Sequence, residues 1–136
     1  MTVRAPVPDD APGILAIAYA QGLPQGWRWP EKGYGFVVEH RERIVAFCCL
    51  YESVYGLVTE ELWDLPGREG ERALALLRRR IEAIAQELAD EREEPVACGG
   101  LVSLSKPRHI KALKKRNYRV EAIALGKMFQ PQRVGG

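Results

Sequence analysis

The sequence lacks any segment that predicts contact with a membrane. A spanning helix needs roughly 20 apolar residues, and the apolar run Ile44–Tyr51 is far shorter than that. The opening residues Met1–Arg4 are not followed by an apolar stretch of the signal-peptide type. We therefore expect a cytoplasmic protein with no membrane partner.

The chain is also poor in cysteine and histidine. It has 3 cysteines and 2 histidines. Cys48 and Cys49 are adjacent, so in a strand they point to opposite faces and cannot easily share a metal ion. His40 and His109 lie in different segments. We therefore predict neither a disulfide framework nor a metal site, and expect buried thiols in a reducing compartment instead.

Acidic residues are missing from the segment 95–120. Residues 1–94 carry 11 Lys/Arg and 17 Asp/Glu, whereas residues 95–136 carry 9 Lys/Arg and one acid, Glu121. A basic segment of this kind fits a nucleotide phosphate, a nucleic acid or an acidic partner, or it is simply a solvated helix face. Only Tyr118 could stack on a base within 106–119, so nucleic acid is the less expected partner.

What the chain does have is an alternation of strand and helix patterns over a length that fits one domain, 1–136, with 131–136 as a loose tail. Apolar runs on both faces of the central strands indicate an α/β (α+β) fold, in which a mixed sheet is covered by helices on both faces. The expected elements are strand 2–7, a helix capped by Asp9 or Asp10, a hairpin of 35–39 and 44–51, strand 55–65, helix 73–89, strand 96–104, a helix from Pro107 to Asn117, and one or two closing strands in 118–129.

Strand 55–65 breaks the simple alternation of a β-strand. One extra residue at Glu60-Glu61 would bring Val58, Trp63 and Leu65 onto one face, as a β-bulge does. A bulge leaves backbone N–H groups unpaired and directed at whatever lies alongside. This strand is therefore a candidate binding edge.

A glycine-containing loop, Gly67–Arg72, follows this strand and is predicted to open the long helix at Ala73. The order strand, glycine turn, helix N-terminus gathers free N–H groups and the positive end of the helix dipole at one spot. This arrangement is typical of phosphate binding.

These segments resemble the GNAT family of acetyl-CoA-dependent N-acyltransferases over about Val3 to Phe129. Val3-Arg-Ala5 with Asp9-Asp10 looks like the family's opening, Gly67-Arg-Glu-Gly70-Glu-Arg-Ala-Leu74 looks like a degenerate pyrophosphate loop, and 108–118 looks like its last helix. The resemblance implies a mostly antiparallel, twisted sheet of six or seven strands, with acetyl-CoA as co-substrate. The chain resembles short members of the family, of a type found in bacteria and also in tailed phages.

The resemblance also implies site residues. Glu60 and Glu61 become candidate catalytic bases, because a carboxylate there could take a proton from the amine. The cofactor would lie against Leu62, Trp63, Asp64, Arg68, Glu69, Gly70, Glu71, Arg72 and Ala73.

Two departures from the family pattern matter. Glu69 and Glu71 bring negative charge towards a pyrophosphate, and its cost depends on whether these side chains point away. Leu113 stands where the family often has a tyrosine that protonates the departing thiolate. Tyr118 and His109 are weak substitutes, since core packing and surface exposure are their expected roles.

The sequence therefore favours an N-acyltransferase that moves an acetyl group to an amine in a ternary complex. One alternative is a catalytically silent GNAT-like binding or virion-associated protein, whose cleft would be blocked by side chains or by the Trp27–Trp29 loop. The other is a phosphate-driven nucleic-acid binder. Exposed Trp27 and Trp29 would also suit a homodimer contact.

Overall fold

A computed structural model describes residues 1–21, 34–53, 56–100, 102, 106–120, 127 and 129–132, with Tyr34, Glu60 and Glu61 described by their backbone alone. The chain forms two compact units, Met1–Leu101 and Val102–Gly136, and each is treated by itself. The expectation of a single domain over 1–136 stays a prediction. The Trp27–Trp29 loop lies outside the described residues.

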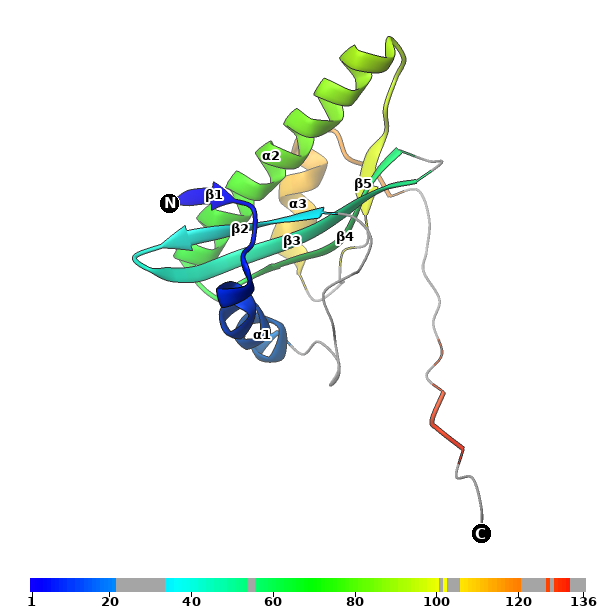
Figure 1. The fold of residues 1–136 in the computed structure, drawn as a ribbon. Coiled ribbons are helices and arrows are strands. Elements are labelled where there is room, and N and C mark those ends of the chain that lie inside the picture. The colour runs from blue at the N-terminus through cyan, green and yellow to red at the C-terminus, as the bar shows by residue number, and fades with distance from the viewer. Residues whose placement is uncertain are drawn as a thin grey trace. The chain divides into compact units, whose positions relative to one another are not determined.

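Within its described residues, the first unit is built on a mixed sheet of five strands, with the order β1-β2-β3-β4-β5 (Figure 1). The first three pairings are antiparallel, and β4 pairs with β5 in parallel. The strands are β1 Thr2–Arg4, β2 Tyr34–His40, β3 Arg43–Ser53, β4 Gly56–Asp64 and β5 Cys98–Gly100.

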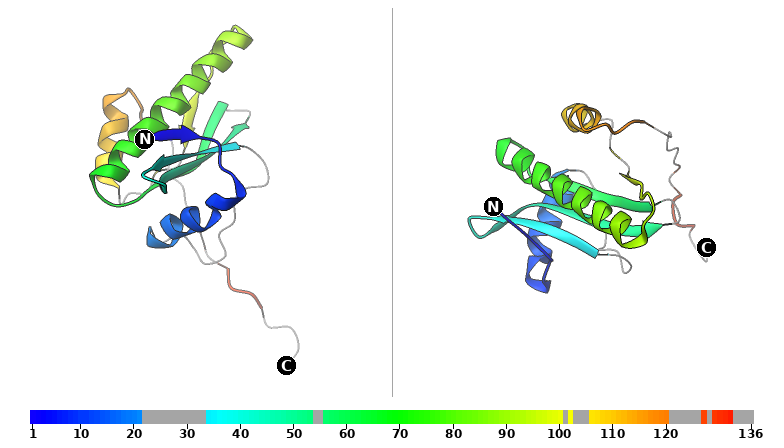
Figure 2. Two further views of the ribbon diagram at one scale, coloured as in Figure 1. Left: turned by 60° about the vertical axis from the view of Figure 1, so that its left-hand side comes forward. Right: turned by 90° about the horizontal axis from the view of Figure 1, so that it is seen from above.

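Two helices of the first unit cover opposite faces of this sheet (Figure 2). Helix α1, Ala11–Ala20, follows the short 3-10 turn η1, Pro8–Asp10, and helix α2 spans Arg68–Arg92. Two separate cores result, because β3 is buried on both faces and its alternate residues point to different helices. The α1 core includes Ile17, Phe47 and Cys49, and the α2 core includes Cys48, Leu50 and Leu77. The predicted mixed sheet with helices on both faces is confirmed.

Helix α3, Pro107–Lys115, is the described element of the second unit. Pro107 opens it, as predicted, because the first turn of a helix needs no N–H from that position. Asn117 follows it with φ of 69°, and the Tyr118 N–H donates to the Leu113 carbonyl at 3.1 Å. This is the left-handed helix end that the sequence predicts. Most of 118–129, where closing strands were predicted, lies outside the described residues.

Two predicted boundaries and one predicted burial were wrong. Helix α2 begins at Arg68 rather than Ala73, since Gly67 is its N-cap residue and the arginines and glutamates after it are good helix formers. Strand β1 ends at Arg4 rather than Val7, where the chain enters η1. Strand 96–104 was expected to be buried, yet Gly99 and Gly100 are exposed.

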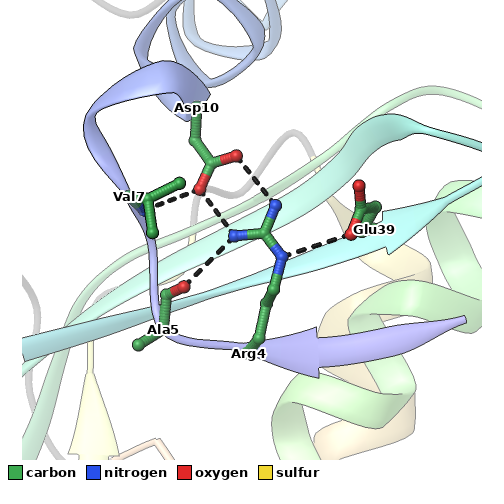
Figure 3. A network of polar contacts seen from close by, with 5 residues as sticks. All are labelled: Arg4, Ala5, Val7, Asp10 and Glu39. Atoms are coloured by element: carbon green, nitrogen blue, oxygen red, sulfur yellow. Dashed lines mark hydrogen bonds and ion pairs between the residues drawn. The ribbon is translucent and has the colours of Figure 1, made fainter.

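An ion-pair network joins β1, η1 and β2 (Figure 3). The Arg4 guanidinium donates to both carboxylate oxygens of Asp10, at 2.7 and 2.9 Å, and its Nε donates to Glu39 at 3.2 Å. Asp10 also accepts the Val7 N–H at 2.7 Å. These bonds tie the start of α1 to the edge of the sheet. Asp10 is the N-cap residue of α1, as predicted, but its side chain makes no capping hydrogen bond to that helix, because the carboxylate is used in this network.

The turn of the β2–β3 hairpin has two central residues, both in the left-handed region. Arg41 has φ of 52° and Glu42 has φ of 64°. Two-residue hairpin turns need this geometry to match the strand twist, but asparagine and glycine adopt it more easily than arginine and glutamate. The predicted hairpin is confirmed, with strain in its turn.

Candidate functional site

A β-bulge interrupts β4 where the alternation of the sequence failed. Cys49 pairs with Glu61 and Leu50 pairs with Thr59, so Glu60 is the extra residue. Beyond the bulge Trp63 pairs with Phe47, and before it Val58 pairs with Tyr51. Since Phe47 and Tyr51 share a face of β3, Val58 and Trp63 also share one, as predicted. The bulge is confirmed at the backbone level.

The ladder between β4 and β5 runs only up to this bulge within the described residues. Its pairs are Leu57 with Cys98, Val58 with Gly99 and Thr59 with Gly100. Described pairing on the other side of β4 continues to Asp64, opposite Ala46 on β3. The bulge at Glu60 is the position at which the backbone of β4 departs from its regular ladder with β3.

Helix α2 starts close to the end of β4 and has no side-chain cap on its first residue. Gly67 is the N-cap residue, with φ of 101°, and makes no capping hydrogen bond. The first N–H group committed to the helix is that of Glu71, which donates to the Gly67 carbonyl at 3.1 Å. The N–H groups of Arg68, Glu69 and Gly70 precede it and form the positive end of the helix dipole.

Gly70 allows this turn to sit directly on the end of β4. A Cβ atom at position 70 would lie 1.7 Å from the Leu65 carbonyl oxygen and 3.0 Å from Asp64 Oδ2. Neither atom could remain where it is beside a side chain. The glycine that the sequence analysis assigned to phosphate binding is therefore required by helix–strand packing as well.

Glu69 points to the β2–β3 hairpin. Its Oε2 accepts a hydrogen bond from the Arg43 guanidinium, and its Oε1 lies 3.6 Å from His40 Nε2. Strand β3 flanks β4 on the side away from β5. The sequence left open which way this carboxylate points, and the structure directs it towards the hairpin.

The other predicted cofactor residues divide by position. Leu62, Trp63 and Asp64 are half-buried at the end of β4, whereas Arg68 and Arg72 are exposed on the first turns of α2. Neither arginine has an ion pair within the described part of the chain. Glu71 is exposed, and Ala73 is fully buried in the α2 core. Glu60 and Glu61 lie on the bulge, and the direction of their side chains is outside what the structure describes.

Two contributors to this region were missed by the sequence analysis. Arg43 and His40 were assigned only to a turn, and nothing in the local pattern marks them, because their partner Glu69 is 26 residues from Arg43. A separate expectation, that His109 on α3 of the second unit lies at the surface, was wrong, because this residue is only 7% exposed.

Metal and thiol chemistry have little support here. No cluster of three or more potential metal ligands occurs among the described residues. Burial raises the pKa of the Cys48 thiol to about 12, so this thiol stays protonated and unreactive near neutral pH. In the described part of the chain no helix is both long and apolar enough to cross a bilayer.

Comparison with known proteins links the fold to acetyltransferases. No protein-family model matches the sequence, and no curated protein matches it either. Among solved structures, an acetyltransferase from Trypanosoma brucei is similar with a TM-score of 0.66 at 13% identity, covering 94% of this chain and 99% of that one.

Two further structures agree over nearly the whole length. The aminoglycoside 6'-N-acetyltransferase of Acinetobacter haemolyticus has a TM-score of 0.64 at 8% identity, covering 96% of this chain and 100% of its own. A GNAT-family acetyltransferase from Streptococcus pneumoniae has a TM-score of 0.61 at 9% identity, covering 96% and 98%. The chain thus has the fold of the GNAT acetyltransferases, which the resemblance in sequence predicted.

Proposed function

We propose that this protein is an acetyl-CoA-dependent N-acyltransferase that moves an acetyl group from acetyl-CoA to an amine. The observation that carries the proposal is the bulge at Glu60 on β4, which lies just before the start of α2, where the N–H groups of Arg68 to Gly70 have no helical acceptors. The GNAT fold supports it, because every structure compared above is called an acetyltransferase.

The residues at the start of α2 fit a nucleotide diphosphate. Three N–H groups without helical acceptors, from Arg68, Glu69 and Gly70, point along the helix axis, and the dipole favours an anion there. Arg68 and Arg72 are exposed on the same turns and add two cations without ion-pair partners in the described residues. These groups would hold the phosphates of acetyl-CoA.

The end of β4 would serve the acyl group. Backbone N–H groups alternate between the two edges of a strand, so those among Leu62 to Asp64 that point away from β3 could donate to the thioester carbonyl and stabilise charge that develops on its oxygen. Acetyl-CoA, when bound, supplies the activated acetyl group.

Glu60 or Glu61 is the proposed base. The attacking amine must lose a proton, and a carboxylate on the bulge could accept it directly or through a water molecule. Two acids adjacent in a regular strand face opposite ways, whereas a bulge changes that alternation. We expect only one of the two to face the acceptor.

Acetyl-CoA binding and turnover test the proposal together. Calorimetric titration should give a 1:1 complex, and thiol release should be detectable with a panel of small amines and lysine peptides. Substituting the true base, by Glu60→Gln or by Glu61→Gln, should lower kcat about 10²–10⁴-fold with acetyl-CoA affinity unchanged. No heat and no thermal shift up to millimolar acetyl-CoA would rule the proposal out.

A second candidate is a GNAT-shaped binding protein without turnover. Its support is Leu113 on α3, which cannot donate a proton to the departing thiolate. Such a protein would bind acetyl-CoA yet release no thiol with any amine, and neither glutamine variant would change anything measurable. The same pair of experiments therefore separates it from the enzyme.

A further inference from the structure

Glu69 is out of place beside a phosphate site. It is the second residue of α2, so its carboxylate sits on the turn whose N–H groups are proposed to hold the acetyl-CoA phosphates. A free carboxylate there would repel the ligand and compete for the positive end of the helix. The inference below rests on the proposed function and concerns how the protein accommodates this charge.

The β2–β3 hairpin holds the carboxylate. Arg43, the first residue of β3, donates from its guanidinium to Glu69 Oε2, and His40, the last residue of β2, brings Nε2 to 3.6 Å from Oε1. Both contacts come from the β3 side of β4, and the cleft expected for acetyl-CoA opens on the β5 side. The carboxylate is thus drawn away from the proposed ligand.

Burial makes this contact important for the charge. Glu69 Oε1 has almost no accessible surface and has no hydrogen-bond partner among the described residues. Water therefore screens that oxygen poorly, and the Arg43 contact on Oε2 is the main source of compensation. Arg43 keeps 58% of its side chain exposed, so the pair remains accessible to salt.

We propose that Arg43, assisted by His40, is a positioning residue for nucleotide binding, which neutralises Glu69 and turns it away from the start of α2. With Glu69 neutralised, the charged side chains that remain exposed on the first turns of α2 are Arg68, Glu71 and Arg72, which together carry a net positive charge. The degenerate loop sequence is compatible with acetyl-CoA because Arg43 in the hairpin offsets the negative charge of Glu69.

A rescue experiment tests this role. Arg43→Met releases an uncompensated carboxylate, so CoA should bind about three- to tenfold more weakly, measured by calorimetry at low salt. The double variant Arg43→Met with Glu69→Gln removes the charge as well, and its affinity should return to within about threefold of the unmodified protein. A merely structural contact would not be rescued in this way.

Matched controls isolate the charge effect. Arg41→Met removes one cation from the same hairpin, where Arg41 has no ion pair in the described residues, and should leave CoA affinity unchanged. Acetyl-pantetheine, which lacks the phosphates of the nucleotide, should bind Arg43→Met and the unmodified protein equally. Glu69→Gln alone should bind CoA as well as the unmodified protein or slightly better.

The outcomes separate the two proposals. If the unmodified protein binds no CoA, the proposed function fails and this inference fails with it. If the unmodified protein binds CoA and Arg43→Met binds it equally tightly, or if the double variant stays as weak as Arg43→Met, this inference alone is overturned. Should Arg43→Met not fold, Glu69→Gln decides, because at least tenfold weaker CoA binding by this isosteric variant contradicts the role given to Glu69.

Discussion

At the scale of single residues, Gly70 serves both the proposed phosphate site and the packing of α2 on the end of β4. It lies in the first turn of α2, and it lets the helix approach the Leu65 carbonyl to a distance that no Cβ could share. Because of this contact, a substitution at position 70 changes packing as well as any ligand contact. A large residue at position 70 would therefore not leave the fold intact.

We predict that Gly70→Ala destabilises the protein by about 1–3 kcal/mol, the usual cost of overpacking. Helix propensity alone predicts the opposite sign, a gain of about 1 kcal/mol for alanine in a helix. Chemical denaturation in urea measures the difference. Gly99→Ala is the matched control, since a Cβ there meets nothing within 4 Å, and it should be neutral or slightly stabilising. A stabilised Gly70→Ala variant would contradict the packing.

Asp10 gives the stability a defined pH dependence. Hydrogen bonds from the Arg4 guanidinium hold the pKa of this carboxyl below its ordinary value of 3.8. A pKa that is lower in the folded state means that the ionised carboxylate stabilises the fold above pH 3.8, and that this stabilisation is lost as the pH falls towards the folded-state pKa.

We predict that Asp10→Asn lowers the free energy of unfolding by about 1–3 kcal/mol at pH 7, the usual range for hydrogen bonds to a charged group. The difference from the unmodified protein should shrink below pH 3.8, because the unmodified protein then loses the same charge. Urea denaturation at pH 7 and pH 3 checks both statements. An equal difference at the two pH values would show that the carboxylate charge is not the cause.

At the scale of elements, the β2–β3 turn carries backbone strain that other residues at its two central positions would relieve. Both central residues adopt positive φ, which costs about 1–2 kcal/mol for each ordinary residue and much less for asparagine or glycine. The double variant Arg41→Asn with Glu42→Gly should therefore raise the free energy of unfolding by about 1 kcal/mol.

Thermal denaturation should report this gain as a rise in Tm of about 3–6 °C. The variant Arg41→Ala with Glu42→Ala removes the same two charges but keeps the strain, so its Tm should not rise. An equal rise in both variants would assign the effect to charge rather than to backbone geometry.

The bulge in β4 is the element on which the proposed site depends. Deleting Glu60 removes the extra residue and lets Cys49–Glu61 and Leu50–Thr59 become neighbouring pairs of a regular ladder. We predict a protein that is at least as stable as the unmodified one, by thermal denaturation, and that no longer binds acetyl-CoA, by calorimetry.

Glu60→Ala is the control for the deletion, because it keeps the bulge and removes only the side chain. It should bind acetyl-CoA normally, whether or not it retains activity. If the deletion variant bound acetyl-CoA, the binding site would not depend on the bulge, which would contradict the prediction.

The elements also show what local sequence can and cannot predict. The bulge could be placed at Glu60-Glu61, because an extra residue shifts the alternation of Val58 and Trp63, which is a local signal. The start of α2 was placed too late at Ala73, because glycine followed by charged residues fits a loop and a first helical turn equally well. Packing on Leu65 through Gly70 decides between them, and that contact is not local.

At the scale of the whole molecule, the same distinction explains the site. The mixed sheet and its covering helices could be predicted from periodicity and element order, and the GNAT fold was what the resemblance to that family implied. The direction of Glu69 could not, since it depends on Arg43 in a hairpin that is distant in sequence. Contacts between side chains that are distant in sequence leave no periodic pattern from which they could be predicted.

The distribution of charge is also a property of the whole chain. Residues 95–136 contain 9 Lys/Arg and one acid, although the net charge of the protein is only +2. Lys111, Lys114 and Lys115 on α3 are exposed, and the last two lie at the C-terminal end of the helix, where its dipole favours cations. This explanation for two of the lysines requires no nucleic acid, in keeping with the weak expectation for such a partner.

The most direct test is a crystal structure of the protein with CoA bound. The account predicts that the pyrophosphate contacts the N–H groups of Arg68 to Gly70, and that the pantetheine arm runs along the β5-facing edge of β4 beyond Thr59. CoA density at any other surface, or an edge of β4 filled by the protein's own side chains, would contradict it.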